Sequence, residues 1–359
     1  MERRSFLKKA AVGASVGAIA APALAQTQPT INWRLASSFP KSLDTLYGAA
    51  EVLSKRVAQL TGGKFNIRVF AGGEIVPALQ VADAVQAGTV EMGHTAAYYY
   101  FGKDPAFAFD CAVPFGMNSR QQTAWFDQGG GRDVLRNFYK DYGIMNFLGG
   151  NTGTQMGGWF RKEIKTMEDF KGLKMRISAF AGKVMQPLGL VPQQLAGGDI
   201  YPALEKGTLD AVEWTTPYDD EKLGFYKVAP FYYAPGWWES GAQLSFYVGI
   251  KEWEKLPKDY QYALEVATYE AHVVTQAAYD AKNPAALARL IKNGAKLRYF
   301  SKPILEACYK ASVTTMEEEA SKNAKFKAIY EPYKRFQRDQ NQWFTVSEGQ
   351  MSNFMASRK

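Results

Sequence analysis

Five polar residues stand at positions where the neighbouring residues predict apolar ones. Arg176 interrupts a strand-like apolar run, Glu213 precedes a tryptophan in another, and Glu239 follows two tryptophans. Asn151 and Gln155 flank a glycine-containing turn. An arginine offers a carboxylate two parallel hydrogen bonds, so the set favours a site for a small organic acid. Each residue alone also has a structural explanation, as a turn amide, a sheet-edge arginine or a surface acid.

The two glutamates limit what such a site holds. A buried carboxylate without a partner is costly, and two of them repel an anionic ligand unless a cation lies between them. Oxygen atoms from Gln and Glu side chains suit a hard ion such as sodium or calcium. The lack of a His/Cys cluster in the sequence argues against zinc. The residue types therefore indicate an organic acid bound beside a hard cation.

Catalytic chemistry has less support. The sequence has no Gly-x-Ser-x-Gly and no Cys/His pairing by spacing, and its two histidines, His94 and His272, stand alone. A lone histidine is more often structural, but His94 follows a predicted strand and is a candidate for a cleft wall. Gly182-Lys183 lacks the glycine arrangement of a phosphate loop. An exported metal-dependent enzyme stays open as an alternative, because the same acids and ion would serve it.

The first 25 residues resemble an export signal rather than part of a fold. A basic start that contains Arg3-Arg4 precedes an Ala/Gly-rich apolar run, and Ala23-Leu24-Ala25 then forms a small-x-small cleavage site. The paired arginines favour the twin-arginine route. The apolar run is shorter than the roughly 20 residues that span a bilayer, which disfavours a membrane anchor. We expect a mature chain that begins near Gln26 and resides in the periplasm.

The net charge bears on the class of ligand, and the two cysteines leave a possible disulfide open. The net charge of +8 is spread along the chain without a block of five like charges, so nucleic-acid binding is unsupported. Mild positive charge favours small anions as ligands. The sequence leaves open whether Cys111 and Cys308 form a disulfide, because it does not place their Cα atoms.

The elements that must position these residues follow an α/β pattern. Residues 31–36 alternate as a strand, 43–60 show a helical period, and 65–70 alternate again. A strand–helix–strand order predicts an α/β fold with crossover connections. The chain has 359 residues, more than the roughly 250–300 at which single cores stop growing, so we expect two lobes.

A short internal repeat supports two similar lobes. Residues 83–91 and 202–210 share an Ala, a Gly and a Thr, and each predicts a helix that ends at a left-handed glycine before a strand. The segments that follow, 94–100 and 214–218, would lie beyond the carboxyl ends of strands, where open α/β sheets bind ligands. We expect these two segments to face each other across a cleft.

The C-terminal part is predicted to be mainly helical. A strand at 244–249 precedes a long helical region, and Asn283-Pro284 predicts the start of a new helix. An apolar stripe along the first helix indicates either packing on the lobes or a seam against a second subunit. Its residues are Leu264, Ala267, Ala271, Val274 and Ala278.

With these segments in view, the chain resembles the solute receptor of a tripartite ATP-independent periplasmic (TRAP) transporter. The branch it resembles binds 2-oxo acids such as pyruvate. The resemblance is carried by "HTAAYYYFGKDPAFAF", "GLKMRISAFAGKVMQPLGLVPQQLAGGDIYPALEKGTLDAVEW" and "VEWTTPYDDEKLGFYKVAPFYYAPGWWESG". It spans nearly the whole mature chain and is dense through residues 31–240.

The resemblance implies a two-lobed, periplasmic-binding-protein-like α/β fold with a ligand cleft between the lobes. Lobe I would span 26–150 and lobe II 151–238. A returning strand and long helices would bridge the lobes over 239–300, and a C-terminal helical segment would follow over 301–359. In this branch such a segment exchanges between two subunits, which implies a homodimer.

The resemblance also assigns roles to the polar residues. Arg176 would pair with the ligand carboxylate, while Gln155, Glu213, Glu239 and the backbone carbonyl of Trp214 would bind the sodium or calcium ion.

Looser matches place Asn151 and the tyrosines from Tyr98 to Tyr100 on the pocket wall. The receptor would pass its ligand to TRAP membrane subunits and catalyse no reaction. Lactate, a dicarboxylate or an amino acid remain alternatives to a 2-oxo acid, and Arg34 is a candidate second arginine for a dicarboxylate.

Overall fold

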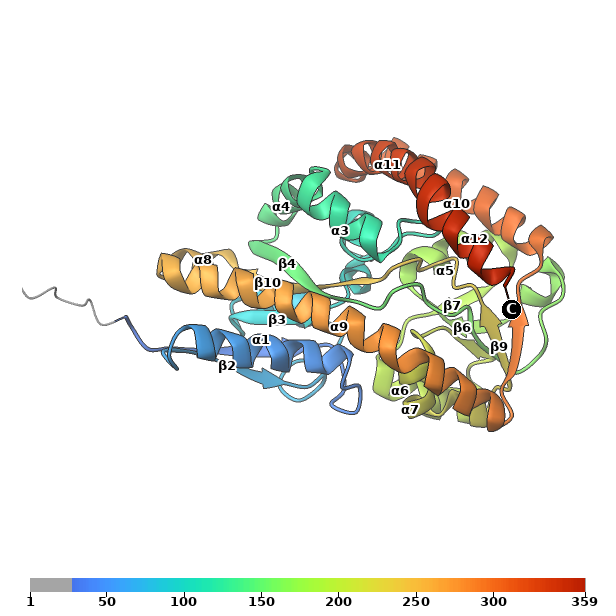
Figure 1. Cartoon of the computed structure of the whole chain (residues 1–359), viewed down its shortest axis with the longest axis horizontal. Helices are drawn as coiled ribbons and strands as arrows, with labels where there is room; N and C mark the ends of the chain where they lie inside the picture. The colour runs from blue at the N-terminus through green and yellow to red at the C-terminus, as the bar shows by residue number, and fades with distance from the viewer. Residues whose placement is uncertain (1–27, 359) are drawn as a thin grey trace, which may run out of the picture.

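The computed structural model describes residues 28–358 and contains two separate sheets, each the centre of one lobe (Figure 1). The export signal expected at 1–25 lies outside the described residues. Among residues 28–358, no helix combines the length and the apolar character that crossing a bilayer requires. The α/β architecture with two lobes agrees with the expectation from the sequence.

Lobe I is built on a five-stranded sheet in the order β2-β1-β3-β10-β4. The first three strands of the chain are parallel, and β10 lies antiparallel between β3 and β4. Because β10 follows lobe II in the chain, lobe I is complete only after the chain returns to it. The bounds are β1 Ile31–Ser37, β2 Phe65–Phe70, β3 Met92–Thr95, β4 Ile144–Asn151 and β10 Gln243–Gly249.

Lobe II is built on a six-stranded sheet in the order β11-β9-β5-β8-β6-β7. Strands β6, β7 and β8 are parallel, and β5 is antiparallel to both β8 and β9. The carboxyl ends of β6, β8 and β9 therefore lie at the edge where β5 begins. The bounds are β5 Gly158–Phe160, β6 Lys174–Arg176, β7 Val191–Gln193, β8 Ala211–Val212, β9 Phe231–Ala234 and β11 Lys296–Tyr299.

Helices cover both sheets. Helices α1 and α9 pack against one face of the lobe I sheet, where Leu53, Val57 and Leu264 meet Phe65 and Phe246 in a buried cluster. The α-helices are α1 Leu46–Leu60, α2 Val81–Gln86, α3 Ser119–Gln128, α4 Gly131–Lys140, α5 Ala179–Met185, α6 Gly197–Glu205, α7 Pro217–Leu223, α8 Ile250–Lys255, α9 Lys258–Lys292, α10 Lys302–Lys322, α11 Ala324–Phe344 and α12 Gln350–Ala356.

The internal repeat corresponds to equivalent positions in the two lobes. In each copy a helix, α2 or α6, ends shortly before a glycine and a strand, β3 or β8. Gly88 and Gly207 have φ values of 71° and 74°, which confirms the left-handed conformation predicted for both.

Three segments connect the lobes: residues 152–157, residues 235–242 and helix α9. Figure 1 shows α9 running along both lobes, and it contacts α1 and β4 on one side and α7 on the other. The prediction of a new helix at Asn283-Pro284 was wrong, because α9 continues through Pro284. The Asn283 side chain does not start a new helix; it accepts a hydrogen bond at 3.1 Å from the backbone N–H of Tyr218, in the first turn of α7.

The apolar stripe of α9 mostly faces inward. Leu264, Ala267 and Ala271 are buried in the lobe I cluster, whereas Val274 is exposed. This favours packing on the lobes over a subunit seam. Cys111 and Cys308 are both buried free thiols, so the disulfide left open by the sequence is not formed.

Candidate functional site

The strand ends of lobe II bring Arg176 and Glu213 together. Arg176 ends β6 and lies opposite Val212 of the parallel strand β8, and Glu213 follows directly. The backbone N–H of Glu213 donates to the carbonyl oxygen of Arg176 at 2.9 Å. Register between two parallel strands thus places a guanidinium and a carboxylate side by side.

The two loop segments that connect the lobes add Gln155 and Glu239. The backbone N–H of Gln155 donates to the carbonyl of Glu239 at 3.1 Å, and that of Gly236 donates to the carbonyl of Gln155 at 2.9 Å. A Cβ atom on Gly236 would lie 2.6 Å from the carbonyl oxygens of Gln155 and Met156. Only glycine therefore allows the two segments to approach this closely.

Arg176 and Glu213 form a fully buried ion pair. The Arg176 Nη1 atom donates to Glu213 Oε2 at 2.9 Å and to the Glu213 carbonyl at 2.6 Å. The guanidinium carbon lies 4.7 Å from the centre of the Trp214 ring. Burial alone would lower the pKa of Arg176, but the negative charge of Glu213 raises it above its usual range, so the side chain stays cationic.

Four buried oxygen atoms at this site have no hydrogen-bond donor among the described residues. They are Glu213 Oε1, both carboxylate oxygens of Glu239, and Gln155 Oε1, on side chains no more than 2% exposed. The Trp214 carbonyl also accepts no hydrogen bond within residues 28–358. Buried acceptors without donors are rare and costly, and oxygen atoms of these types are the ligands of sodium and calcium. The set therefore fits a hard cation.

The carboxylates also need a cation on electrostatic grounds. Burial and the charge of Glu239 raise the pKa of Glu213 well above its usual range, although Arg176 opposes this. Burial raises the pKa of Glu239 to about 8, again against Arg176. Ser178 lies near enough to lower the Glu239 pKa without forming a hydrogen bond of normal geometry. One arginine does not balance two buried acids and an anionic ligand.

A small cavity of about 10 Å³, enough for roughly one water molecule, lies between the lobes beside these groups. Lobe II and its connecting loop contribute Thr152, Gln155, Trp214 and Thr215 to its wall. Lobe I contributes Phe39, Leu46, Ala96, Tyr98, Tyr99, Ala242 and Leu244. The segments after β3 and β8 thus face each other across the cleft, as the repeat predicted.

The three consecutive tyrosines divide between the cavity and the core. Tyr98 and Tyr99 line the cavity, but Tyr100 does not. The Tyr100 hydroxyl lies 3.1 Å from the N–H of Ala82 and 2.8 Å from Thr95 Oγ1. Residues 97–100 form a 3₁₀ helix, which turns successive side chains in different directions.

Asn151 and His94 lie beside the cavity rather than on its wall. Asn151 Oδ1 accepts a hydrogen bond from the N–H of Gly153 at 2.9 Å, so the side chain shapes the turn that carries Gln155. His94 Nε2 lies 2.8 Å from the Gly149 carbonyl, and its ring stacks on Phe246. Their proposed ligand contacts remain predictions.

Sequence patterns did not single out the apolar part of the wall. Phe39, Leu46 and Leu244 read as ordinary core residues, and they are buried in the core cluster. Ser178 was also missed, although it lies only two residues after Arg176, the last residue of β6, and is a polar residue near a strand end. Their roles depend on which segments meet across the cleft.

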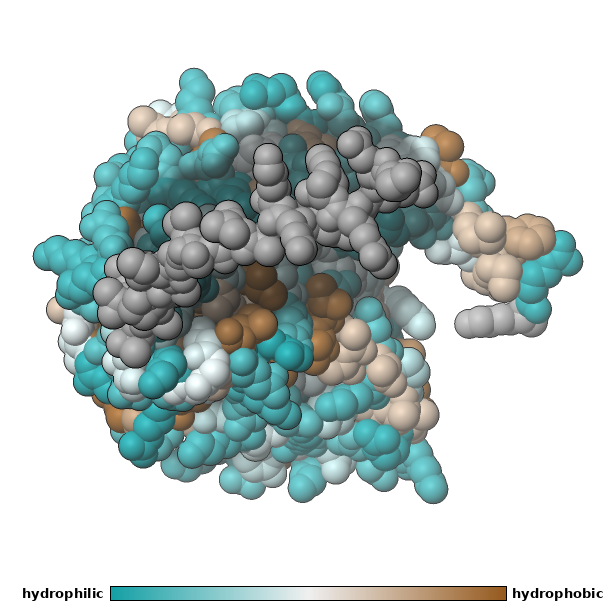
Figure 2. All heavy atoms as spheres, turned by 60° about the vertical axis from the view of Figure 1, so that its left-hand side comes forward, coloured by the Kyte–Doolittle hydropathy of each residue, from teal (hydrophilic) through white to brown (hydrophobic). Residues whose placement is uncertain are grey.

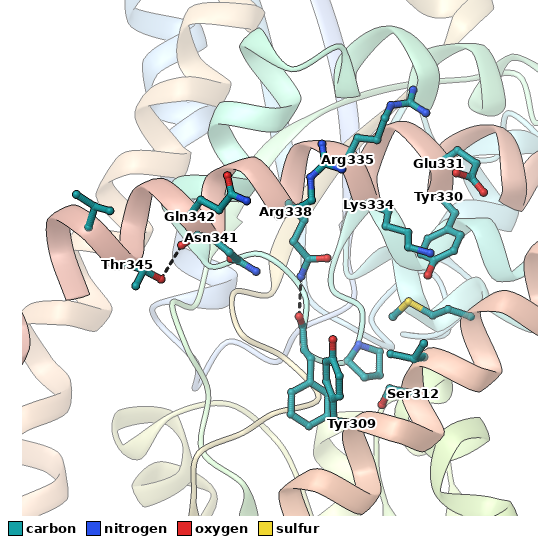
Figure 3. A pocket seen from close by; sticks show the side chains of 16 residues that line it. Tyr309, Ser312, Tyr330, Glu331, Lys334, Arg335, Arg338, Asn341, Gln342 and Thr345 are labelled. Atoms are coloured by element: carbon teal, nitrogen blue, oxygen red, sulfur yellow. Dashed lines mark hydrogen bonds between the residues drawn. The ribbon is translucent and has the colours of Figure 1, made fainter. Parts of the chain in front are cut away.

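A wider hollow of about 900 Å³ lies elsewhere, between α10 and α11 (Figure 3). Its labelled residues include Tyr309, Lys334, Arg335 and Arg338. Gln337 Nε2 donates to the carbonyl of Phe115 at 2.7 Å across it. None of the residues that hold the four donor-free oxygens lines this hollow, so it is separate from the candidate site.

The two-lobed α/β fold and the candidate site between the lobes agree with the match of this chain to a known family. The model of "Bacterial extracellular solute-binding protein, family 7" matches residues 36–323. The chain belongs to this family. Family 7 members are exported solute-binding proteins, so the chain is a receptor rather than an enzyme.

Similar family 7 proteins carry specific descriptions. A monocarboxylate 2-oxoacid-binding periplasmic protein of Nostoc sp. is 49% identical over 99% of this chain and 100% of its own length. A TRAP transporter solute-binding protein of Bordetella bronchiseptica is 53% identical, with a TM-score of 0.91 over 92% of this chain and 98% of that one. That structure is a dimer with copurified calcium and picolinate in one active site.

A third protein adds a different ion. The TRAP solute-binding protein of Pseudoalteromonas atlantica is 37% identical, with a TM-score of 0.88 over 90% of this chain and 99% of that one. It was solved with bound sodium and pyruvate.

Proposed function

We propose that this family 7 protein binds a 2-oxo monocarboxylate, pyruvate or a longer acid, together with sodium or calcium, and delivers it to TRAP membrane subunits. The observation that carries the proposal is the group of four donor-free buried oxygens beside Arg176. Glu213, Glu239, Gln155 and the Trp214 carbonyl would hold the ion. The Arg176 guanidinium would hold the ligand carboxylate.

The chemistry of a 2-oxo acid suits this arrangement. Its carboxylate and its 2-oxo oxygen form a five-membered chelate ring with a cation, while the other carboxylate oxygen stays free for an arginine. Picolinate, the ligand of the Bordetella protein, offers a ring nitrogen and a carboxylate oxygen in the same chelate geometry. The Nostoc relative is named for 2-oxo acids and the Pseudoalteromonas relative holds pyruvate, which supports the same class here.

The proposal extends to location and assembly. We expect cleavage near Ala25-Gln26 and a mature receptor in the periplasm, supported by the periplasmic relatives. We also expect a homodimer formed through the C-terminal segment, residues 343–358. This segment exposes five large hydrophobic side chains, and α12 packs extensively only on residues 345–349. Figure 2 shows it as a narrow projection at the right-hand edge that carries hydrophobic residues.

Calorimetry with the ligand-stripped protein tests the proposal. Pyruvate is titrated with sodium, with calcium, and with a chelator in potassium buffer. We expect micromolar binding, about −8 kcal/mol, that depends on one of the two ions. Tight binding that is independent of any cation would contradict the metal-bridged site.

Glu213→Gln provides the matched test of the ion ligands. It keeps the side-chain volume but removes one negative charge, so affinity for the cation and for pyruvate should fall together by tenfold or more, about 1.4 kcal/mol. Arg176→Ala should lower the free energy of unfolding by about 3–5 kcal/mol, because Glu213 then stays buried without its partner. Unchanged binding in both variants would remove them from the site.

A further inference from the structure

The two lobes divide the cavity wall by chemistry. The charged side chains beside the cavity, those of Arg176, Glu213 and Glu239, all come from lobe II and the loop that leaves it. Lobe I contributes apolar side chains that are at most 3% exposed. They are Phe39, Leu46, Ala96, Leu244 and, at the end of the connecting segment, Ala242, and the rings of Tyr98 and Tyr99 complete this side of the wall. A ligand held by its acid head on lobe II therefore presents its remaining atoms to a mainly apolar wall on lobe I.

Four hydroxyls lie on this wall, those of Tyr98, Tyr99, Thr152 and Thr215, and the two threonine hydroxyls are already hydrogen-bonded. Thr152 Oγ1 donates to the Gly153 carbonyl at 2.9 Å and accepts from Gln155 Nε2 at 3.2 Å. Thr215 Oγ1 donates to Asp219 Oδ2 at 3.4 Å. The cavity wall, as residues 28–358 form it, holds no cationic side chain, so a negatively charged group on the ligand tail would be buried without a partner of opposite charge, which is unfavourable. An alkyl tail therefore suits this wall better than a charged one.

Leu46 is the wall residue tied most directly to lobe closure. It begins α1, and its neighbour Thr45 donates through Oγ1 to Asp219 Oδ1 of lobe II at 2.6 Å. This contact is buried, and Tyr279 of α9 donates to the same carboxylate at 2.5 Å. Asp44 adds an exposed ion pair with Lys282 at 3.1 Å. The closed lobes thus hold the backbone of Leu46 in place against the cavity.

We infer that Leu46 limits the length of the ligand tail. An apolar tail that fits beneath Leu46 permits the Thr45–Asp219 contact and full closure, whereas a longer tail displaces Leu46 and prevents that contact. This inference rests on the proposed function, because it concerns the tail of the same 2-oxo acid.

The test measures the affinity of the cation-loaded protein for a homologous series: pyruvate, 2-oxobutyrate, 2-oxopentanoate, 2-oxohexanoate and 2-oxooctanoate. In the wild type, each added methylene should strengthen binding by about fourfold until the tail reaches Leu46, and binding should then weaken. Leu46→Ala should move the optimum to a longer acid and weaken pyruvate binding several-fold. Leu46→Phe should move it to a shorter acid. An identical optimum in the folded variants would overturn the inference.

The two Leu46 variants also protect against a folding artefact. Truncation of a buried leucine lowers stability, so each variant is checked by its melting curve, and Leu46→Phe decides if Leu46→Ala does not fold. No binding of any acid to the wild type would overturn the proposed function and this inference together. Pyruvate binding with an unmoved optimum would overturn the inference alone.

Thr45→Val tests the link to closure. The substitution keeps the side-chain shape but removes the cross-lobe hydrogen bond. Affinity should fall for acids up to the optimum and stay unchanged for acids beyond it, because the contact is already lost with a long tail. An equal loss for every acid would show that Leu46 does not act through this contact.

A matched pair of acids tests the apolar wall. 2-Oxopentanoate and 2-oxoglutarate have the same number of carbon atoms, but the second ends in a carboxylate. We expect 2-oxoglutarate to bind tenfold to a hundredfold more weakly, because the wall that the described residues form has no cationic side chain to pair with its second carboxylate. Equal affinities would overturn the assignment of an apolar tail.

Discussion

At the scale of single residues, the site depends on oxygens that the protein does not satisfy itself. One carboxylate oxygen of Glu213 accepts a hydrogen bond from Arg176, and within residues 28–358 the other has no donor. Neither carboxylate oxygen of Glu239 has a donor in this part of the chain. Buried acceptors without donors are costly, so four of them in one place indicate a species that completes them. Buried acids of raised pKa hold protons in the absence of a cation, so a proton and a metal ion compete for the same oxygens.

This competition predicts that cation affinity rises with pH. With a pKa of about 8 in the cation-free protein, Glu239 is mostly protonated at pH 6, and an incoming ion must displace that proton. Affinity should increase between pH 6 and pH 8, by up to tenfold per unit for each proton released. Calorimetry in two buffers of different ionisation enthalpy would count the protons.

Glu239→Gln is the control, because it removes the titrating group. Its weaker cation binding should be less dependent on pH over the same range. A wild-type affinity that stays constant from pH 6 to pH 8 would contradict the competition.

At the scale of elements, the site is held by strand ends and by two loops that lie against each other. The 152–157 segment forms backbone hydrogen bonds with residues 215, 236, 239 and 242, which fixes Gln155 relative to Glu239. Loops of this kind lack the regular ladder of a sheet. Their alignment therefore depends on close approach at a single residue, Gly236.

Gly236→Ala should therefore disturb the ion site without changing any of the side chains that would bind the ion. The new Cβ meets two backbone oxygens at 2.6 Å, so the loops must separate, at a cost of about 1–3 kcal/mol of stability. Cation affinity should fall as well. Denaturant unfolding and calorimetry measure the two effects.

Gly48→Ala is the matched control for this substitution. Gly48 lies inside α1 with open space where a methyl group would be added, and alanine there should raise stability by up to about 1 kcal/mol. Equal effects of the two substitutions would show that Gly236 has no special role.

At the scale of the whole molecule, the two lobes are joined by α9 and also by the C-terminal helices. Helix α10 packs against α5 of lobe II, and α11 packs against α3 and α4 of lobe I. Beyond α11 the chain leaves this packing. Phe354 and Met355 are 53% and 58% exposed, which is unfavourable for an isolated chain.

The exposed segment predicts a dimer that a single substitution weakens. Phe354→Asp should shift the mass measured by light scattering from two chains toward one, because the charge opposes burial of that surface. Asn353→Asp, at the neighbouring position, is the control and should leave the dimer intact. Ligand affinity should not change in either variant, since the segment is remote from the cleft. A wild-type protein that is monomeric at tens of micromolar would contradict the prediction.

Much of the architecture was readable from local patterns. The alternating runs predicted β1, β2 and β10, and the helical period predicted α1, because one buried face imposes its own spacing on a strand or a helix. Helix α9 did not follow the local pattern, because it continues through Pro284 where a helix boundary was predicted. A proline removes one hydrogen bond and predicts a boundary, but packing of the helix along both lobes maintains it.

The residue types by themselves determined the head chemistry of the site: one arginine, two acids and an amide at strand ends indicate an anion beside a hard cation. Only the tertiary structure decided which apolar residues close the cavity, that Tyr99 rather than Tyr100 faces it, and that Leu46 adjoins the contact between the lobes. A charged residue in an apolar strand stands out in the sequence, because burying a charge is costly. A leucine on a cavity wall does not, because the same side chain is favourable anywhere in a core, and only the approach of distant segments gives it a role.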